Sequence, residues 1–249
     1  MKIMMCGKGG CGKSTVSSLL AKEFAARGFD VLVLDTDESN FGLHRQLGLP
    51  LPPDFIEYFG QKEDVLKLVM ASQGAHSFIS GECRFANLPV NYVSEKGRIH
   101  LMSVGKITEA GEGCACPFGV ITQQFISNLK PERDEIVLVD TEAGVEHFGR
   151  GTDNSADAIF MVVDPSYESL KLAGKVSELC KSIGKPLFFV LNKVTPDIES
   201  TMSDTVRQYG RIAGILPAYN TILQAGLKGY ELQADYDEIA RLADFCQEL

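Results

Sequence analysis

The sequence has 249 residues, of which 45% are hydrophobic, and a formal net charge of -9. This length fits one large α/β domain or two small ones, and we expect one domain over residues 1–249. The excess of 33 Asp+Glu over 24 Lys+Arg argues against a nucleic-acid partner, because a surface that neutralises phosphates must be basic.

Neither a membrane span nor a secretory signal is expected. The longest apolar runs, such as residues 158–163, are far shorter than the roughly 20 residues of a membrane helix. The N-terminal apolar run breaks at Gly7, too early for a signal peptide. Seven cysteines, an odd number, do not look like a disulfide framework. We therefore expect a cytoplasmic protein with reduced thiols, some of them binding metal.

The chain begins with a strand, a glycine-rich loop and a helix. Residues 2–6 form a short apolar run typical of a buried strand, and residues 14–27 carry apolar side chains at helical spacing. Between them lies a match to the phosphate-loop pattern G-x-x-x-x-G-K-[ST]. Glycines let backbone N–H groups surround phosphate oxygens, while the lysine supplies a cation and the serine can ligate Mg²⁺. This predicts a nucleoside triphosphate site formed by Gly7, Lys8, Gly9, Gly10, Cys11, Gly12, Lys13, Ser14 and Thr15.

Strand-like runs then alternate with helical patterns along the chain. Strands are predicted at 31–34, 99–104, 136–139, 158–163, 187–191 and 212–216. Helices are predicted at 55–70, 118–129, 166–183, 198–209 and 236–249. This alternation indicates βαβ crossovers, and so a doubly wound, mainly parallel α/β sheet with helices on both faces. Residues 50–97 are the least regular, and we expect an insertion on the sheet there, not a second domain.

Three aspartates end predicted strands. Asp35 and Asp37 close the strand at 31–34, and Asp140 closes the strand at 136–139. Open α/β sheets bind ligands at the carboxyl ends of their strands. Carboxylates there can hold Mg²⁺ or orient water for attack on a γ-phosphate. A single such aspartate could simply cap a turn, but three beside a phosphate loop favour a nucleotide site.

Lys8 makes the loop more specific. The pattern K-G-G-x-G-K-[ST] resembles the deviant phosphate loop of the family that includes MinD, ParA and the nitrogenase iron protein. That resemblance implies a homodimer that closes across ATP. Lys13 would bind phosphate within its own subunit, and Lys8 would reach the nucleotide of the second subunit. The alternative is that Lys8 is a solvated loop lysine.

The same resemblance implies roles for the strand ends. Ser14 would ligate Mg²⁺ directly. Asp35 would contact the ligands of the metal and not the ion itself. Asp37 would position the attacking water, and Asp140 would end the Walker B strand.

Further positions resemble the nucleotide contacts of this family. Four of them follow the predicted strands at 187–191 and 212–216 and resemble positions that contact adenine. They are Asn192, Lys193, Pro217 and Tyr219. Gly144, in the segment after the Walker B strand, is also predicted to contact the nucleotide.

Cys114 and Cys116 form a C-x-C motif in a glycine-rich segment. Two thiolates at positions i and i+2 of an extended loop can chelate a soft metal. A closed thiolate site needs four ligands, and the chain has no second C-x-C or C-x-x-C. A two-fold dimer with this loop on its axis would supply four sulfurs, suited to Zn²⁺ or square-planar Ni²⁺. Alternatively, Cys83 completes a site within one chain, or the two cysteines are incidental.

Taken together, the deviant loop, the C-x-C motif and residues 140–151 resemble the CooC-type nickel-insertion ATPases. These proteins mature carbon monoxide dehydrogenase and acetyl-CoA synthase, and the run A-G-x-E-H-x-x-R-G at 143–151 is typical of them. The resemblance covers essentially the whole chain and is weakest over 50–97. It implies an ATPase whose ATP-bound homodimer holds one Ni²⁺ or Zn²⁺ between paired C-x-C motifs. Hydrolysis would be coupled to nickel delivery to the client enzyme.

Two positions depart from this pattern, Cys11 in the loop and Glu38 after the aspartate. An exposed thiol at Cys11 would be open to oxidation. His147 could be a metal ligand, a catalytic group or a polar switch residue, and we favour the last.

Two other functions use the same machinery. One is a positioning ATPase like MinD or ParA, which needs a membrane-seeking tail or a DNA-binding surface. Residues 234–249 carry five acidic residues against Arg241, and this charge should repel anionic lipid. The other is an electron donor like the nitrogenase iron protein. That family takes its cluster cysteines from separate segments, unlike the C-x-C motif.

Overall fold

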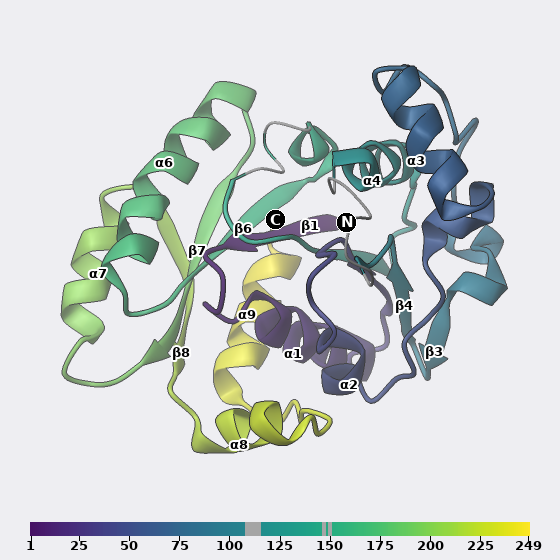
Figure 1. Ribbon diagram of the computed structural model, residues 1–249. Coiled ribbons are helices and arrows are strands. Elements are labelled where there is room, and N and C mark those ends of the chain that lie inside the picture. Colours follow the sequence, from purple (N-terminus) through teal and green to yellow (C-terminus); the bar gives the residue numbers. More distant parts are fainter. Residues whose placement is uncertain (108–115, 146–147, 149–150) are drawn as a thin grey trace.

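The computed structural model describes residues 1–107, 116–145, 148 and 151–249. Its strands form one eight-stranded sheet of order β3-β4-β2-β5-β1-β6-β7-β8 (Figure 1). Neighbouring strands are parallel except for the antiparallel pair β3-β4. The strands are β1 (Lys2–Gly7), β2 (Asp30–Asp35), β3 (Ser94–Lys96), β4 (Ile99–Ser103), β5 (Glu135–Asp140), β6 (Ala158–Val163), β7 (Leu187–Val194) and β8 (Arg211–Pro217). The predicted mainly parallel α/β fold is confirmed.

Helices cover both faces of this sheet, as Figure 1 shows. The helices are α1 (Lys13–Ala26), α2 (Leu43–Leu47), α3 (Lys62–Ala71), α4 (Cys116–Asn128), α6 (Tyr167–Ile183), α7 (Glu199–Arg207), α8 (Asn220–Lys228) and α9 (Asp237–Gln247). Side chains of α1, α2 and α9 share one buried cluster, and those of α3, α4, α6 and α7 share another. No helix of the described residues is long and apolar enough to span a bilayer.

Strand β1 shows why its residues form the centre of the sheet. Ile3 and Met5 pack into the cluster on the α1 side, while Met4 and Cys6 pack into the cluster on the α4 side. Successive side chains of a strand point to opposite faces, so a strand covered on both sides is apolar along most of its length. All six residues of β1 are buried, and the charged group of Lys2 at its start is satisfied by backbone carbonyl oxygens.

The helix predicted over 55–70 is wrong in its first part. Residues Phe55–Phe59 form a short 3-10 helix, and α3 begins only at Lys62. Gly60, with φ of 140°, separates the two. A helix cannot continue through that conformation, although the apolar spacing runs across it. Residues 50–97 also contribute β3, which pairs with β4 at the edge of the sheet.

Candidate functional site

The carboxyl ends of β1, β2 and β5 meet beside the glycine-rich loop. In the sheet register, Asp140 pairs with Met5 of β1 and with Asp35 of β2. Strand β1 ends at Gly7, the loop follows, and α1 begins at Lys13. The predicted phosphate loop and the strand-end aspartates therefore lie together at one edge of the sheet.

The loop glycines are required by both conformation and space. Gly7 and Gly12 have φ of 140° and 103°. A Cβ on Gly7 would lie 2.4 Å from the Val162 carbonyl oxygen, and one on Gly12 would lie 2.2 Å from Asn192 Nδ2. The first N–H groups of α1 have no acceptor within the helix. A tight loop that leads into such a helix end fits a phosphate group.

Lys13 is buried and lies back across the loop. Its Nζ donates to the carbonyl oxygens of Gly7 and Lys8, both at 3.4 Å. Its charge is therefore held over the curve of the loop, where phosphate oxygens would bind. Gly144, from the segment after β5, donates its N–H to the Gly7 carbonyl oxygen at 3.1 Å and so lies beside the loop as well.

Ser14 and Asp140 form a preassembled pair of oxygen donors. The Ser14 hydroxyl donates to Asp140 Oδ2 at 2.6 Å, and Ser17 donates to Oδ1 at 3.1 Å. Burial raises the pKa of Asp140, while the hydrogen bond from Ser14 and the charge of Lys13 oppose that rise. Hydroxyl and carboxylate oxygens are the ligands that Mg²⁺ prefers, so this donor set fits the ion.

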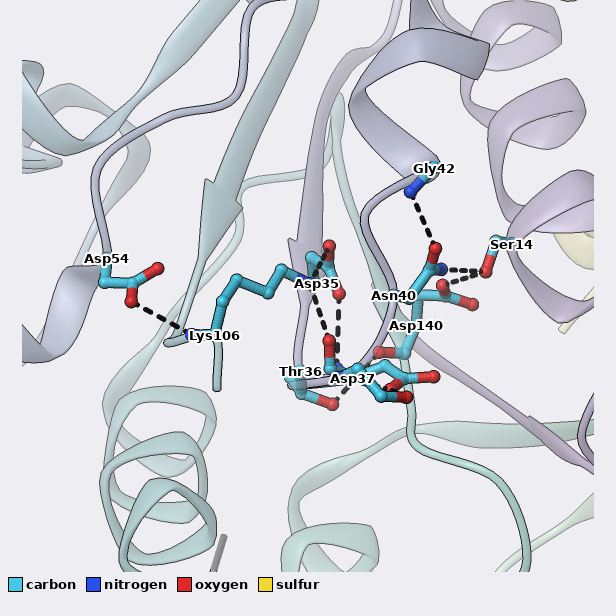
Figure 2. A network of polar contacts seen from close by, with 10 residues as sticks. Ser14, Asp35, Thr36, Asp37, Asn40, Gly42, Asp54, Lys106 and Asp140 are labelled. Carbon is cyan, nitrogen blue, oxygen red and sulfur yellow. Dashed lines mark hydrogen bonds and ion pairs between the residues drawn. The ribbon is translucent and has the colours of Figure 1, made fainter. Parts of the chain in front are cut away.

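The loop after β2 contains a buried ion pair that we did not predict. Lys106 Nζ lies 2.6 Å from Asp35 Oδ2 and 2.6 Å from the Asp37 carbonyl oxygen (Figure 2). Both side chains of the pair are nearly inaccessible to solvent, at 2% for Lys106 and 3% for Asp35. Burial raises the pKa of Asp35 to about 7, and the charge of Lys106 opposes the rise. Asp35 thus neutralises a buried lysine instead of facing the phosphate loop.

Asp37 and Asn40 connect this loop to the nucleotide site. Asp37 Oδ1 accepts hydrogen bonds from the backbone N–H and the hydroxyl of Ser39, at 3.0 and 2.6 Å. Asn40 Nδ2 donates to Ser14 Oγ at 2.7 Å, as Figure 2 shows. Asn40 was also missed by the sequence analysis, because no motif places an asparagine at that position.

The four predicted adenine-contacting residues come together in one cavity. Asn192, Lys193, Pro217 and Tyr219 line a volume of about 290 Å³ with Thr15 of α1. Asn192 Nδ2 donates to the Cys11 carbonyl oxygen at 2.8 Å, and Lys193 Nζ donates to that of Gly10 at 2.6 Å. The cavity is therefore attached to the phosphate loop, as a base pocket must be.

Lys8 points along the sheet edge toward β6. Its Nζ lies 3.8 Å from Asp164 Oδ2, and its side chain is about one third exposed, at 35%. An exposed ion pair of this length contributes little to stability. Lys8 can therefore leave Asp164 at small cost.

The structure corrects two interpretations of the cysteines. Cys11 is fully buried, and burial raises its thiol pKa to about 11, so the condition for its oxidation, an exposed thiol, is not met. Cys83 hydrogen-bonds through its backbone to Asn128 and Lys130, at the opposite end of α4 from Cys116. Twelve helical steps of about 1.5 Å separate the two ends by roughly 18 Å. Cys83 and Cys116 therefore cannot ligate one metal.

Cys114 and His147 lie outside the described residues. Cys116 is the first residue of α4, and the described structure does not include its side chain. Among the described residues, no group of three or more His, Cys, Asp or Glu side chains could hold a metal ion. The metal site predicted at the C-x-C motif therefore stays a prediction.

A strand, a phosphate loop and a helix, with strand-end carboxylates beside the loop, define a P-loop nucleotide-binding protein. The family model for the CobQ/CobB/MinD/ParA nucleotide-binding domain matches residues 2–230, and the chain therefore belongs to this family.

Two relatives are similar to this chain in sequence, and one solved structure shares its fold. It is 44% identical over 241 residues to an uncharacterized ATP-binding protein of Methanocaldococcus jannaschii, covering 96% of each chain. It is 30% identical over 244 residues to the carbon monoxide dehydrogenase accessory protein CooC of Rhodospirillum rubrum, covering 93% of this chain and 90% of that protein. The septum site-determining protein MinD of Pyrococcus horikoshii, complexed with Mg-ADP, has a TM-score of 0.71 at 16% identity. That alignment covers 99% of this chain and 96% of MinD and shows a shared fold.

The loop geometry predicts different outcomes for two glycine substitutions. Gly12→Ala places a Cβ against the Asn192 amide, which must move and lose its bond to Cys11. Gly28→Ala is the matched control, because Gly28 also has positive φ, of 93°, has no atom within 4 Å of an added Cβ and lies outside the loop. We expect both to lose about 1–2 kcal/mol of unfolding free energy from the backbone conformation. Only Gly12→Ala should lose more than that, together with nucleotide affinity, as measured by urea unfolding and titration calorimetry. Equal affinities would contradict this reading of the loop.

Proposed function

We propose that this protein is an ATP-hydrolysing metallochaperone that carries nickel to a nickel-containing client enzyme. The observation that carries the ATPase part is the Ser14–Asp140 pair, 2.6 Å apart, beside the buried Lys13. A hydroxyl and a carboxylate that can hold a cation therefore lie beside one phosphate loop, together with a lysine. The 44% identical relative is named as ATP-binding, which supports ATP as the nucleotide.

Each described residue of the site has a role in the proposed hydrolysis. Lys13 and the loop N–H groups neutralise phosphate charge, and Ser14 ligates Mg²⁺ with support from Asp140. Bound Mg²⁺ supplies positive charge to the phosphates. Asp37, two residues after the end of β2, orients the attacking water. The cavity lined by Asn192 and Tyr219 holds the adenine.

We further propose that ATP drives formation of a homodimer. Lys8 is the residue that a second copy would use, since it lies at the rim of the loop on a long, partly exposed ion pair. Exchanging Asp164 for a triphosphate in the second subunit replaces a partner of one negative charge with a partner of several. A cation supplied only on dimerisation would make hydrolysis depend on assembly.

The nickel part of the proposal rests on the cysteines and on one relative. Cys114 and Cys116 lie on the segment that leads into α4, and two such pairs on a dimer axis give the four sulfurs that Ni²⁺ or Zn²⁺ accepts. The relative at 30% identity is a carbon monoxide dehydrogenase accessory protein. This makes carbon monoxide dehydrogenase, or the related acetyl-CoA synthase, our proposed client.

The C-terminal helix argues against a membrane-positioning function. Ile239 and Leu242 of α9 are fully buried in the cluster shared with α1, and its first turn carries Asp237 and Glu238. An amphipathic helix that binds lipid needs a free apolar face and basic residues. The apolar face of α9 already packs against the protein, and Arg241 is the one basic residue of this helix.

Solution mass tests the proposal directly. We expect the native chain to double its mass with Ni²⁺ or Zn²⁺, and also with Mg²⁺ and ATP. Cys114→Ser should lose only the metal-driven dimer, and Lys8→Ala only the ATP-driven dimer, so each variant is the control for the other. Unchanged metal stoichiometry in Cys114→Ser would remove the delivery function and leave the ATPase. An ATP-driven dimer in Lys8→Ala would remove the proposed role of Lys8.

A further inference from the structure

Lys106 connects three segments of the chain through its three polar groups. Its Nζ binds Asp35 and the carbonyl oxygen of Asp37, each at 2.6 Å. Its backbone N–H donates to Asp54 Oδ2 at 2.9 Å, and its carbonyl oxygen accepts a hydrogen bond from Lys62 Nζ. Figure 2 shows the side chain reaching from the Asp54 contact across to the end of β2. The residue thus ties the loop after β2 to residues 54–62.

The loop held by Lys106 is also the one that contacts the proposed magnesium ligand. Next to Lys106, Ile107 donates its N–H to the Glu38 carbonyl oxygen at 3.1 Å. Three residues beyond Asp37, Asn40 donates to Ser14 Oγ. Ser14 Oγ can accept two contacts, and the Asn40 amide takes one of them. A cation bound to the same oxygen would lie next to the positive amide hydrogens of Asn40 and repel them. A cation bound at Ser14 would therefore act directly on the loop that Lys106 holds.

On its other side, the Lys106 segment packs against the start of α4. A Cβ added to Gly105 would lie 2.7 Å from Phe118 Cε1, so the ring lies directly against this backbone. Phe118 is buried and is two residues from Cys116. Lys62, which holds the Lys106 carbonyl, also has its Nζ 5.7 Å from the centre of the Phe118 ring.

We propose that Lys106 is a positioning residue that couples the loop at 37–40 to the first turn of α4. This inference rests on the proposed function, since it supplies the path between the ATP site and the C-x-C end of α4. Close-packed interiors transmit displacement from one element to the next, and here the contacts are continuous from Ser14 to Phe118. Coupling between two sites is reciprocal, so nucleotide and metal each change the affinity of the other.

Hydrogen exchange measures this coupling without nickel or zinc and without turnover. In the native chain, a non-hydrolysable ATP analogue with Mg²⁺ should slow exchange in peptides covering 118–126. The variant Asp35→Asn/Lys106→Met removes both charges of the buried pair and leaves neither one unpaired. We expect it to bind the analogue, measured by calorimetry, and to lose the slowing in α4. Lys62→Met, which leaves the loop contacts in place, should reduce the slowing.

Lys2→Met is the matched control. Lys2 is also a buried lysine, and its Nζ holds the far end of α4 through the carbonyl oxygens of Ile126 and Leu129, at 3.0 and 3.3 Å. This variant should keep the nucleotide-dependent slowing. A full response of α4 in the double variant, or analogue binding to the native chain without any response there, overturns the inference. Failure of the native chain to bind the analogue overturns the proposed function first, so the two failures are distinguishable.

Discussion

Lys106→Met is expected to destabilise the protein by about 3–5 kcal/mol at pH 8, because it leaves a buried carboxylate without its cation. Asp35 is 3% exposed, and the negative charge of Asp140 adds to its electrostatic cost. Methionine keeps most of the volume of lysine. The lost free energy of unfolding is therefore caused more by the missing charge than by poorer packing. Urea unfolding, followed by circular dichroism, measures the difference from the native chain.

The loss of unfolding free energy in Lys106→Met should be larger at high pH than at low pH, because the pKa of Asp35 is raised in the folded protein. Burial already raises that pKa to about 7 in the native chain, against the pull of Lys106. Removing the lysine raises it further above the unfolded value of about 3.9. The folded variant then binds a proton that the unfolded chain releases, so its stability falls as pH rises above about 4 and recovers as pH falls. Unfolding at pH 5 should therefore show a clearly smaller difference than at pH 8.

Asp35→Asn/Lys106→Met is the control for charge. With no carboxylate at that position, the double variant should recover much of the lost stability at pH 8 and show a flatter pH profile than Lys106→Met. If the single variant lost the same free energy at pH 5 and pH 8, packing and not charge would explain the defect.

The buried pair also shows where sequence reasoning ends. Asp35 was predicted because it closes an apolar strand, a signal contained in a few consecutive residues. Its partner Lys106 is 71 residues away, and the two meet only because β2 and β4 are neighbours with Asp35 in register with Ser103. A lysine three residues after a strand gives no local sign of such a contact. The one available signal was its place at the carboxyl edge of the sheet.

The central strands and the edge strand β8 were predicted closely, whereas β3 and α8 were not predicted. A strand such as β6 (Ala158–Val163) is buried at every position, and a continuous apolar run records that burial directly. Helix α8 has no buried residue, and two of the three residues of β3 are exposed. β3 has only three residues, too few to show a period, and α8 is a short helix whose apolar residues do not record burial.

The phosphate loop was predictable for a different reason. Its residues are set by contacts within and immediately around the loop, such as the space that Gly7 and Gly12 need, so the pattern survives as a short motif. The cavity near Asn192 was reached only through resemblance, because its walls come from α1, from the ends of β7 and β8, and from the start of α8.

Lys13→Gln is expected to lower the kcat for ATP hydrolysis by about 10²–10³-fold, the usual effect of removing one buried group that stabilises transition-state charge. Lys13 is 6% exposed, and its Nζ lies over the Gly7 and Lys8 carbonyl oxygens. Glutamine keeps an amide that can donate to those oxygens but carries no charge. Phosphate release under saturating ATP and Mg²⁺ measures the rate.

Lys22→Gln is the control, because it removes a lysine charge from the same helix, α1, at a position away from the loop. Lys22 lies on the same helix, and its Nζ pairs with Glu231 and donates to the Leu47 carbonyl oxygen, away from the loop. Its removal should leave kcat within about twofold of the native value, since partly exposed pairs contribute roughly 1 kcal/mol or less and only to stability. A folded Lys13→Gln protein that hydrolysed ATP as fast as Lys22→Gln would show that the loop lysine does not neutralise the reacting phosphate. The assignment of the loop as the catalytic centre would then be wrong.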